Sequence, residues 1–177
     1  MLTKAGRSEM FEVLNQSDDE LLKDCEVETF RGSGPGGQKA DTTESAVRVT
    51  HEPTGISVTA SERRSQRANR KKALRRLRVQ YATEVRHDVD PERIKIPDQL
   101  QKYLNGGIQI NAKNPHFPFW VKLVLDVLEA NEAQLSTTAD CFDVSTNQLV
   151  NFLARDSSVL EEANELRAEH GYGRIKT

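Results

Sequence analysis

The stretch Gly32-Ser33-Gly34-Pro35-Gly36-Gly37-Gln38 is the most distinctive part of the chain. Four of the ten glycines fall between residues 32 and 37. A loop with so few side chains can adopt positive φ angles and bring its backbone N–H groups close to another molecule. The amide of Gln38 is neither a nucleophile nor a titratable group, so chemistry in this loop has to come from positioning and hydrogen bonding. Most hydrolase mechanisms based on acid–base catalysis are therefore excluded.

Other glycine-rich loops fit this stretch less well. A phosphate-binding loop of the G-x-x-x-x-G-K-[ST] type needs Ser or Thr after its lysine, but Ala40 follows Lys39 here. Gly32, Gly34 and Gly37 have the spacing of a dinucleotide-binding fingerprint, but this spacing alone is a weak signal. A flexible surface turn is the remaining simple interpretation, and the residues that follow the loop argue against it.

Short strands are expected on both sides of the loop. Residues 26–30 alternate polar and apolar side chains and lead directly into it, and residues 46–50 alternate in the same way. Residues 52–55 have the proline and glycine positions of a type I turn that starts at Glu52, and residues 56–59 return as a partner strand. The pattern predicts a small, mainly antiparallel sheet that presents Gly36-Gly37-Gln38 from one end.

A long basic helix is expected over residues 65–86. Leu74, Leu77, Tyr81 and Val85 recur at steps of three and four and so share one face. Nine basic residues lie between positions 63 and 78, with only Glu62 nearby to oppose them. A solvated charged face is the alternative, but the single sign of charge favours RNA and about five phosphate contacts. The residues expected to bind RNA are Arg63, Arg64, Arg67, Arg70, Lys71, Lys72, Arg75, Arg76 and Arg78.

Taken together, these motifs resemble one known family. The residues that carry the likeness are Ser33–Gln38, Thr42–His51, Pro53–Ile56, Glu62–Gln66, Asn69-Arg70 and Ala73-Leu74. This pattern, from about Val27 to Arg78, resembles the peptidyl-tRNA hydrolysis domain of class I peptide chain release factors. One departure is the run Lys39-Ala40-Asp41, where the family usually has a His-Val-Asn-like or Arg-Asn-containing run. The aspartate places a negative charge where RNA is expected to approach.

The resemblance implies an activity and a set of partners. In the family, this loop enters the peptidyl-transferase centre of the large ribosomal subunit and promotes hydrolysis of peptidyl-tRNA. Carried over, Gly36 and Gly37 allow a tight backbone path, the Gln38 main-chain N–H stabilises the reacting oxygen, and its side chain orients or excludes water. The partners implied are rRNA and peptidyl-tRNA. No resident cofactor is implied, but N5-methylation of Gln38 is, and with it a glutamine methyltransferase.

Only some 25 residues precede the resembling region, so no codon-reading domain is expected. We therefore expect codon-independent hydrolysis on stalled ribosomes, as in ribosome rescue. The alternative is a non-catalytic or attenuated ribosome-binding or RNA-binding regulatory protein that retains the release-factor fold. The intact Gly36-Gly37-Gln38 motif favours the first interpretation.

Composition limits the remaining possibilities. The 177 residues carry a net charge of −2, but residues 61–95 carry a local charge of +7. Cys25 and Cys141 are far apart, and the four histidines show no metal-ligand spacing, so neither a disulfide scaffold nor a metal site is expected. No apolar run is long enough to span a membrane, and no signal peptide is evident, so a soluble cytoplasmic protein is expected.

The predicted fold class is α+β, with a second, all-helical part. Residues 1–95 are expected to form the hydrolysis domain, opened by a short helix with a capping box at Ser17. Residues 96–114, rich in Pro and Gly, read as a linker. Residues 115–177 are expected to form a helix-turn-helix-like domain with a second capping box at Ser145. Acidic neighbours argue against sequence-specific DNA binding, and packing within the chain or on a protein partner is preferred.

Overall fold

The computed structural model describes residues 10–31 and 45–177, and by compactness these divide into two units. One unit spans residues 15–81. The other combines residues 10–14 with residues 82–177, so the division falls near the end of the helix α4 (Gln66–Glu84). The predicted limits at residues 95 and 114 lie elsewhere and stay a prediction.

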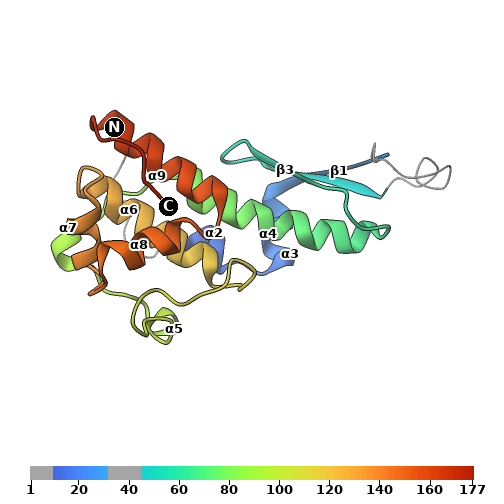
Figure 1. Cartoon of the computed structure of the whole chain (residues 1–177). Helices are drawn as coiled ribbons and strands as arrows, with labels where there is room; N and C mark the ends of the chain where they lie inside the picture. The colour runs from blue at the N-terminus through green and yellow to red at the C-terminus, as the bar shows by residue number, and fades with distance from the viewer. Residues whose placement is uncertain (1–9, 32–44) are drawn as a thin grey trace. The chain divides into compact units, whose positions relative to one another are not determined.

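The first unit contains a three-stranded antiparallel sheet (Figure 1). Its elements are α3 (Asp18–Leu21), η1 (Leu22–Asp24), β1 (Cys25–Phe30), β2 (Ala46–His51), β3 (Ile56–Ala60) and most of α4. The strand order β1-β2-β3 confirms the predicted small antiparallel sheet. The predicted capping box is also present, since the Ser17 side chain accepts from the Glu20 N–H while Glu20 accepts from the Ser17 N–H.

Apolar side chains of the sheet and of α4 form the core of this unit. Val47 and Val49 on β2 are fully buried, as are Ala73 and Leu77 on α4. The turn between β2 and β3 starts one residue earlier than expected, because the His51 carbonyl accepts hydrogen bonds from the N–H groups of Thr54 and Gly55. Gly55 has a φ of 71°, which glycine adopts without the steric cost that a side chain would bring.

The second unit is mainly helical. Its elements are part of α2 (Glu12–Asn15), the end of α4, η2 (Pro91–Arg93), α5 (Asp98–Gln101), α6 (Phe117–Ala130), α7 (Leu135–Asp140), α8 (Thr146–Leu153) and α9 (Ser157–Glu169). Residues 117–128 of α6 are all buried, so this helix is the centre of the unit. The Trp120 ring lies 5.9 Å from Phe142 and 6.5 Å from Phe152, measured between centroids.

The helix ends of this unit follow from local sequence. The capping box predicted at Ser145 is present, with Gln148 as its third helical residue. Asp143 has a φ of 53° in the turn between α7 and α8, and short polar residues tolerate this conformation better than most. Gly171, with a φ of 77°, follows the end of α9. Together the two units confirm the predicted α+β class.

Candidate functional site

The sheet brings together the two ends of the segment that contains the glycine-rich loop. Gly36, Gly37 and Gln38 themselves lie outside the described residues. Phe30, the last residue of β1, is paired with Ala46, the first residue of β2. The Arg48 guanidinium lies 5.4 Å from the centre of the Phe30 ring and 3.2 Å from the Glu28 carboxylate. The chain therefore leaves and re-enters the sheet at the same end.

Asn69 fixes the point where the chain returns to the sheet. Its side chain is fully buried. The side-chain N–H groups donate to the carbonyl oxygens of Ser45, at 2.6 Å, and Arg63, at 2.7 Å. Its side-chain oxygen accepts from the Arg63 N–H at 2.9 Å. One side chain thus ties the start of β2 to the turn before α4, and it satisfies three backbone groups.

Asn69 was not among the site residues predicted from the sequence. A signal was nonetheless present, because Asn69 precedes Ala73, Leu77 and Tyr81 at steps of four, and all three are buried. An amide in a row of buried positions needs internal hydrogen bonds, since burying it without partners is costly. The spacing was therefore sufficient to mark Asn69 as a structural hydrogen-bonding residue.

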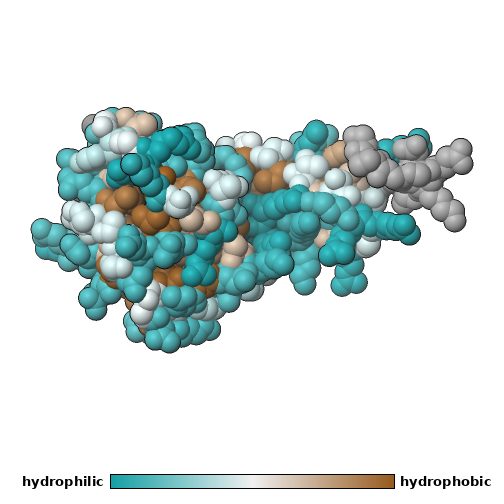
Figure 2. Space-filling model, viewed as in Figure 1, coloured by the Kyte–Doolittle hydropathy of each residue, from teal (hydrophilic) through white to brown (hydrophobic). Residues whose placement is uncertain are grey.

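Six of the nine predicted RNA-binding residues lie on the surface. The exposed residues are Arg63, Arg64, Arg67, Arg70, Lys71 and Arg75. Figure 2 shows the hydrophilic colour along α4. None of the six side chains has an ion pair with the described acidic residues. Their charges are therefore free of carboxylates that would compete with a nucleic-acid phosphate within residues 10–31 and 45–177.

Two further members of the predicted set, Lys72 and Arg76, bind the same acidic residue. The Lys72 ammonium lies 3.1 Å from a Glu62 oxygen, and the Arg76 guanidinium bonds to that oxygen as well. Arg76 also donates to the Thr59 carbonyl at 2.5 Å. Desolvation works against ionisation of Glu62, but a backbone N–H bond and the two cations outweigh it and lower its pKa to about 2.

The ninth residue, Arg78, is mostly buried and has internal partners. Its side chain is 14% exposed. The guanidinium lies 2.8 Å from the Asp18 carboxylate and donates to the Gln16 carbonyl at 3.0 Å. These contacts join α4 to the segment at the start of α3. The structure therefore places Arg78 in a different setting from the six exposed cations.

The second unit contains a buried charged cluster that the sequence analysis missed. Lys122 and Asp126 are fully buried on α6, with the ammonium 2.6 Å from both carboxylate oxygens. Lys122 also donates to the Val85 carbonyl at 2.5 Å, and Arg86 lies 3.1 Å from Asp126. Burial lowers the pKa of Lys122 to about 8. The cluster joins α6 to residues 85–87. In the sequence, Lys122 and Asp126 are four residues apart, which is also the spacing of an exposed helical ion pair, so their burial could not be predicted.

Three observations on the described residues concern thiol reactivity, metal binding and membrane crossing. Burial, with the nearby charges of Asp24 and Glu52, raises the pKa of Cys25 to about 11, so its thiolate is disfavoured. Within residues 10–31 and 45–177, no group of three His, Cys, Asp or Glu side chains is arranged to hold a metal ion. No described helix combines the length and the apolar character that crossing a bilayer requires.

Comparisons with known proteins agree with this geometry. A family model described as the RF-1 domain matches residues 19–113, which is more than half of the chain. Peptide chain release factor 1 from Hydrogenobaculum sp. is 49% identical over 75 residues, which cover 40% of this chain and 21% of that protein. The protein of the same name from Rickettsia bellii is 49% identical over 71 residues, covering 40% and 20%. The chain spans about a fifth of the length of these curated relatives. It is a release-factor-like protein, and by the family match it belongs to the RF-1 domain family.

Proposed function

We propose that this chain hydrolyses the ester of peptidyl-tRNA in the peptidyl-transferase centre of the large ribosomal subunit, without reading a codon, and so rescues stalled ribosomes. The observation that carries the proposal is a set of six exposed cations at the start of and along α4, which have no ion pair with the acidic residues that the structure describes, in a chain that retains Gly36-Gly37-Gln38. Family membership supports the reaction class. Peptide release from ribosomes that carry no codon in the A site tests the codon-independent part.

In this proposal the chemistry is divided between the loop and the scaffold. Water attacks the ester carbonyl, the bond to the tRNA 3′ oxygen breaks, and that oxygen takes up a proton. The Gln38 backbone N–H stabilises the developing negative charge, and its side chain orients the water. Losing a donor of this kind costs about 10²–10³ in rate. The pairing of Phe30 with Ala46 and the hydrogen bonds of Asn69 fix the two strand ends between which the segment with the loop begins and ends.

The exposed cations have a separate task, which is to hold the protein on rRNA. Arginine and lysine contacts to phosphates position a protein on nucleic acid without reading sequence. Arg63, Arg64, Arg67, Arg70, Lys71 and Arg75 form this RNA-facing set in our proposal. Replacing two of them should therefore weaken ribosome binding while leaving the reaction of the bound complex unchanged.

The test is release of labelled peptide from purified ribosomes that carry no codon in the A site. Ribosomes stopped at a stop codon serve as the comparison. Wild-type protein should release peptide from the codon-free complexes, and Gly37→Ala and Gln38→Ala should still bind but lose release. The Arg67→Glu/Arg70→Glu pair should bind weakly and release peptide at saturating protein. Release that persists in Gly37→Ala would disprove the catalytic role of the loop.

The same assay separates the alternative function, an attenuated RNA-binding regulator. The run Lys39-Ala40-Asp41 favours this alternative, because the aspartate opposes the approach of RNA. If wild-type protein binds ribosomes without releasing peptide because of Asp41, then Asp41→Asn should restore release. Release by wild-type protein on codon-free complexes, equal to that of Asp41→Asn, would rule the alternative out.

Two further proposals concern methylation of Gln38 and the role of residues 115–177. We propose that Gln38 is a substrate for N5-methylation by a glutamine methyltransferase and that no resident cofactor is needed. We also propose that residues 115–177 act as a helix-turn-helix-like packing module. Mass spectrometry of the protein purified from its natural source would show whether Gln38 carries a methyl group.

A further inference from the structure

The proposed function leaves unused a polar surface in the second unit. Between Gln99 and Leu125 the sequence has no Asp or Glu, although these make up 27 of the 177 residues. On residues 99–113, every exposed polar side chain is an amide or a lysine. We use the name amide–lysine surface for these residues together with two exposed residues of α8: Gln99, Gln101, Lys102, Asn105, Gln109, Asn111, Lys113, Asn147 and Asn151.

Hydrogen bonds hold the backbone of this surface on α8. Gln148 donates its side-chain N–H to the Gly106 carbonyl at 2.5 Å, and Arg155 donates to the Ile110 carbonyl at 2.5 Å. Gly107 has a φ of 127°, and a Cβ at this position would lie 3.2 Å from the Gln148 side chain. The lysines and amides are therefore displayed on a fixed backbone, and a partner that binds them has little further ordering cost to meet.

The same contacts argue against reading of DNA by α8. A recognition helix needs free polar side chains that reach base edges in the major groove. Gln148 is committed to its capping box and to Gly106, and Arg155 to Ile110 and Gln109. Along the exposed face of α8, Asn147 and Asn151 are the amides that have no side-chain hydrogen bond to another residue of the ranges 10–31 and 45–177.

A protein partner also fits this surface poorly. The centres of protein interfaces are rich in aromatic residues, methionine and arginine, and poor in lysine. Among the described residues, Tyr172 is the one large apolar side chain counted as exposed, and it follows α9 rather than lying on the amide–lysine surface. The only aromatic ring on the segment itself is the half-buried Tyr103, with the Lys102 ammonium 5.2 Å from its centre.

RNA fits the surface better. Amides and lysines match phosphate oxygens and ribose hydroxyls, which are the groups that proteins contact without reading sequence. Acidic residues are exposed elsewhere in the unit, for example Glu161, Glu165 and Glu169 on α9. These carboxylates repel a polyanion. Residues 99–113 carry no acidic side chain, and the carboxylate of the preceding Asp98 accepts a hydrogen bond from Gln101 at 3.2 Å, so this segment is the more favourable approach.

We propose that the amide–lysine surface is a second RNA contact, which binds the sugar–phosphate backbone of single-stranded or loop RNA without reading its sequence. The inference goes beyond the proposed function, because it assigns an RNA contact to the helical unit. It does not depend on peptide release.

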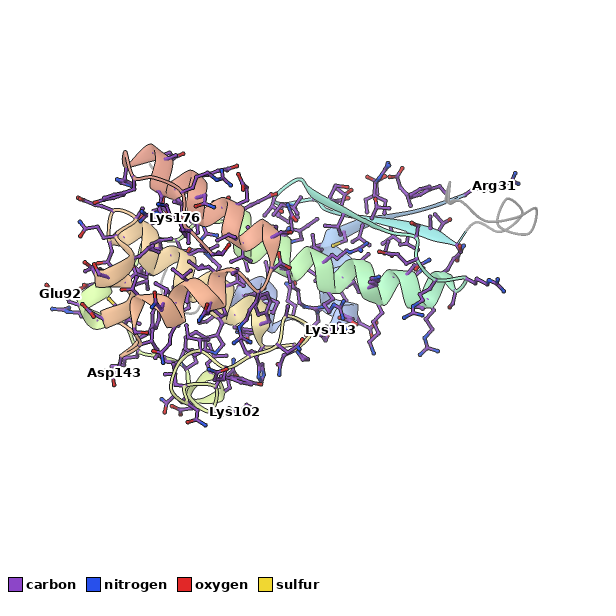
Figure 3. The ribbon with its side chains drawn as sticks, viewed as in Figure 1. Arg31, Glu92, Lys102, Lys113, Asp143 and Lys176 are labelled. Atoms are coloured by element: carbon purple, nitrogen blue, oxygen red, sulfur yellow. The ribbon has the colours of Figure 1, made fainter. Side chains whose placement is uncertain are left out.

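The test uses the full-length chain and a short fluorescent single-stranded RNA of mixed sequence. Binding is measured by anisotropy at several salt concentrations. The test variant is Lys102→Glu/Lys113→Glu. The control is Arg93→Glu/Lys176→Glu, which makes the same change of charge at exposed positions of the same unit outside the surface. Figure 3 shows Lys102 and Lys113 on the segment between α5 and α6, and Lys176 on the C-terminal tail.

The test variant should bind RNA several-fold more weakly than the control. Its salt dependence should be shallower by about 1.4 in the slope of log K against log salt, because each contact to single-stranded phosphate contributes about 0.7. RNA should also slow hydrogen exchange of residues 99–113 in wild-type protein. Equal binding and equal slopes for the two variants would overturn the inference.

Two further results identify the cause of a failure. If the test variant binds RNA normally but binds ribosomes weakly, the surface contacts a ribosomal protein and the RNA inference is wrong. The Arg67→Glu/Arg70→Glu pair reports on α4, and Gln38→Ala reports on hydrolysis. The RNA-binding result for Lys102→Glu/Lys113→Glu therefore stands whether or not Gln38→Ala loses peptide release.

Discussion

Asn69→Ala should lower the free energy of unfolding of the sheet-containing unit by about 3 kcal/mol. The substitution removes three hydrogen bonds, to the Ser45 carbonyl and to the N–H and carbonyl of Arg63. Each such bond contributes about 1 kcal/mol net, and more where the abandoned partner stays out of reach of water. Ser45 is half-buried, so its carbonyl is the partner that water replaces least well.

The readout has to report on the unit that contains Asn69. Trp120, the only tryptophan, belongs to the other unit, so its fluorescence is unsuitable. Native-state hydrogen exchange of the β2 amides, such as those of Val47 and Val49, is the direct measurement. A loss of about 3 kcal/mol corresponds to exchange about 100-fold faster when these amides exchange by unfolding of the unit.

Asn69→Asp separates the hydrogen bonds from simple packing. The aspartate keeps the volume and the acceptor for the Arg63 N–H, but it loses both N–H donors and sets a carboxylate against two carbonyl oxygens. It should destabilise at least as much as alanine at neutral pH and should recover partly at low pH, where the protonated acid has one donor. Asn147→Ala, at an exposed position on α8, is the control. If Asn69→Asp were as stable as wild type at pH 7, the hydrogen-bond reasoning would be refuted.

Three other predictions concern charged groups. Asp126→Asn should lower the free energy of unfolding by about 3–5 kcal/mol, because it leaves two cations buried without a carboxylate. Lys122→Met should lower it by less than half as much, since Arg86 still pairs with Asp126. Chemical denaturation followed by Trp120 fluorescence measures both losses. The pKa of Lys122 is lowered by burial to about 8 from 10.5, so between these pH values the unfolded chain binds more protons and stability should rise with pH. Lys122→Met should remove that rise in stability curves measured from pH 8 to 10.5. The pKa of Glu62 is lowered to about 2, so its contribution to the free energy of unfolding is present above about pH 4.5 and should be lost as the pH falls toward 2. Glu62→Gln should remove this acid dependence and should lower the free energy of unfolding by under about 1 kcal/mol at pH 7, because the group is substantially exposed. The same variant should bind RNA more tightly, as measured by anisotropy.

Local sequence signals predicted the regular elements well. The alternation at residues 26–30 and 46–50 corresponds to β1 and β2, and both predicted capping boxes are present. These features depend on side chains within a few residues of one another, so they can be read from one segment at a time. The start of the β2–β3 turn was misplaced by one residue, because His51 accepts the turn bonds instead of Glu52.

Long-range contacts were not predictable in the same way. Residues 96–114 were predicted to be a linker. In the structure, Gly106 and Ile110 of this segment accept hydrogen bonds from Gln148 and Arg155, which are 42 and 45 positions away in the chain. Lys122 and Asp126 have the spacing of an exposed helical ion pair, and they are buried only because neighbouring segments cover every side of α6. The sequence periodicity describes one helix and carries no information on how many sides are covered.

The charges at the start of α4 illustrate why pairing matters more than composition. Nine basic residues between positions 63 and 78 suggested an RNA face with a single opposing acid, Glu62. In the structure, Lys72 and Arg76 both bind the Glu62 carboxylate, so its negative charge is neutralised locally. Asp18 engages Arg78 in the same way. The three paired cations stabilise the fold around α4. The other six have no ion pair with an acidic residue of the described ranges, and in our proposal they release counterions on binding RNA, which is the source of salt-dependent affinity. A phosphate can approach these six without first displacing a carboxylate of residues 10–31 or 45–177. In our proposal the RNA-binding face is therefore defined by which cations lack such partners rather than by the number of arginines and lysines.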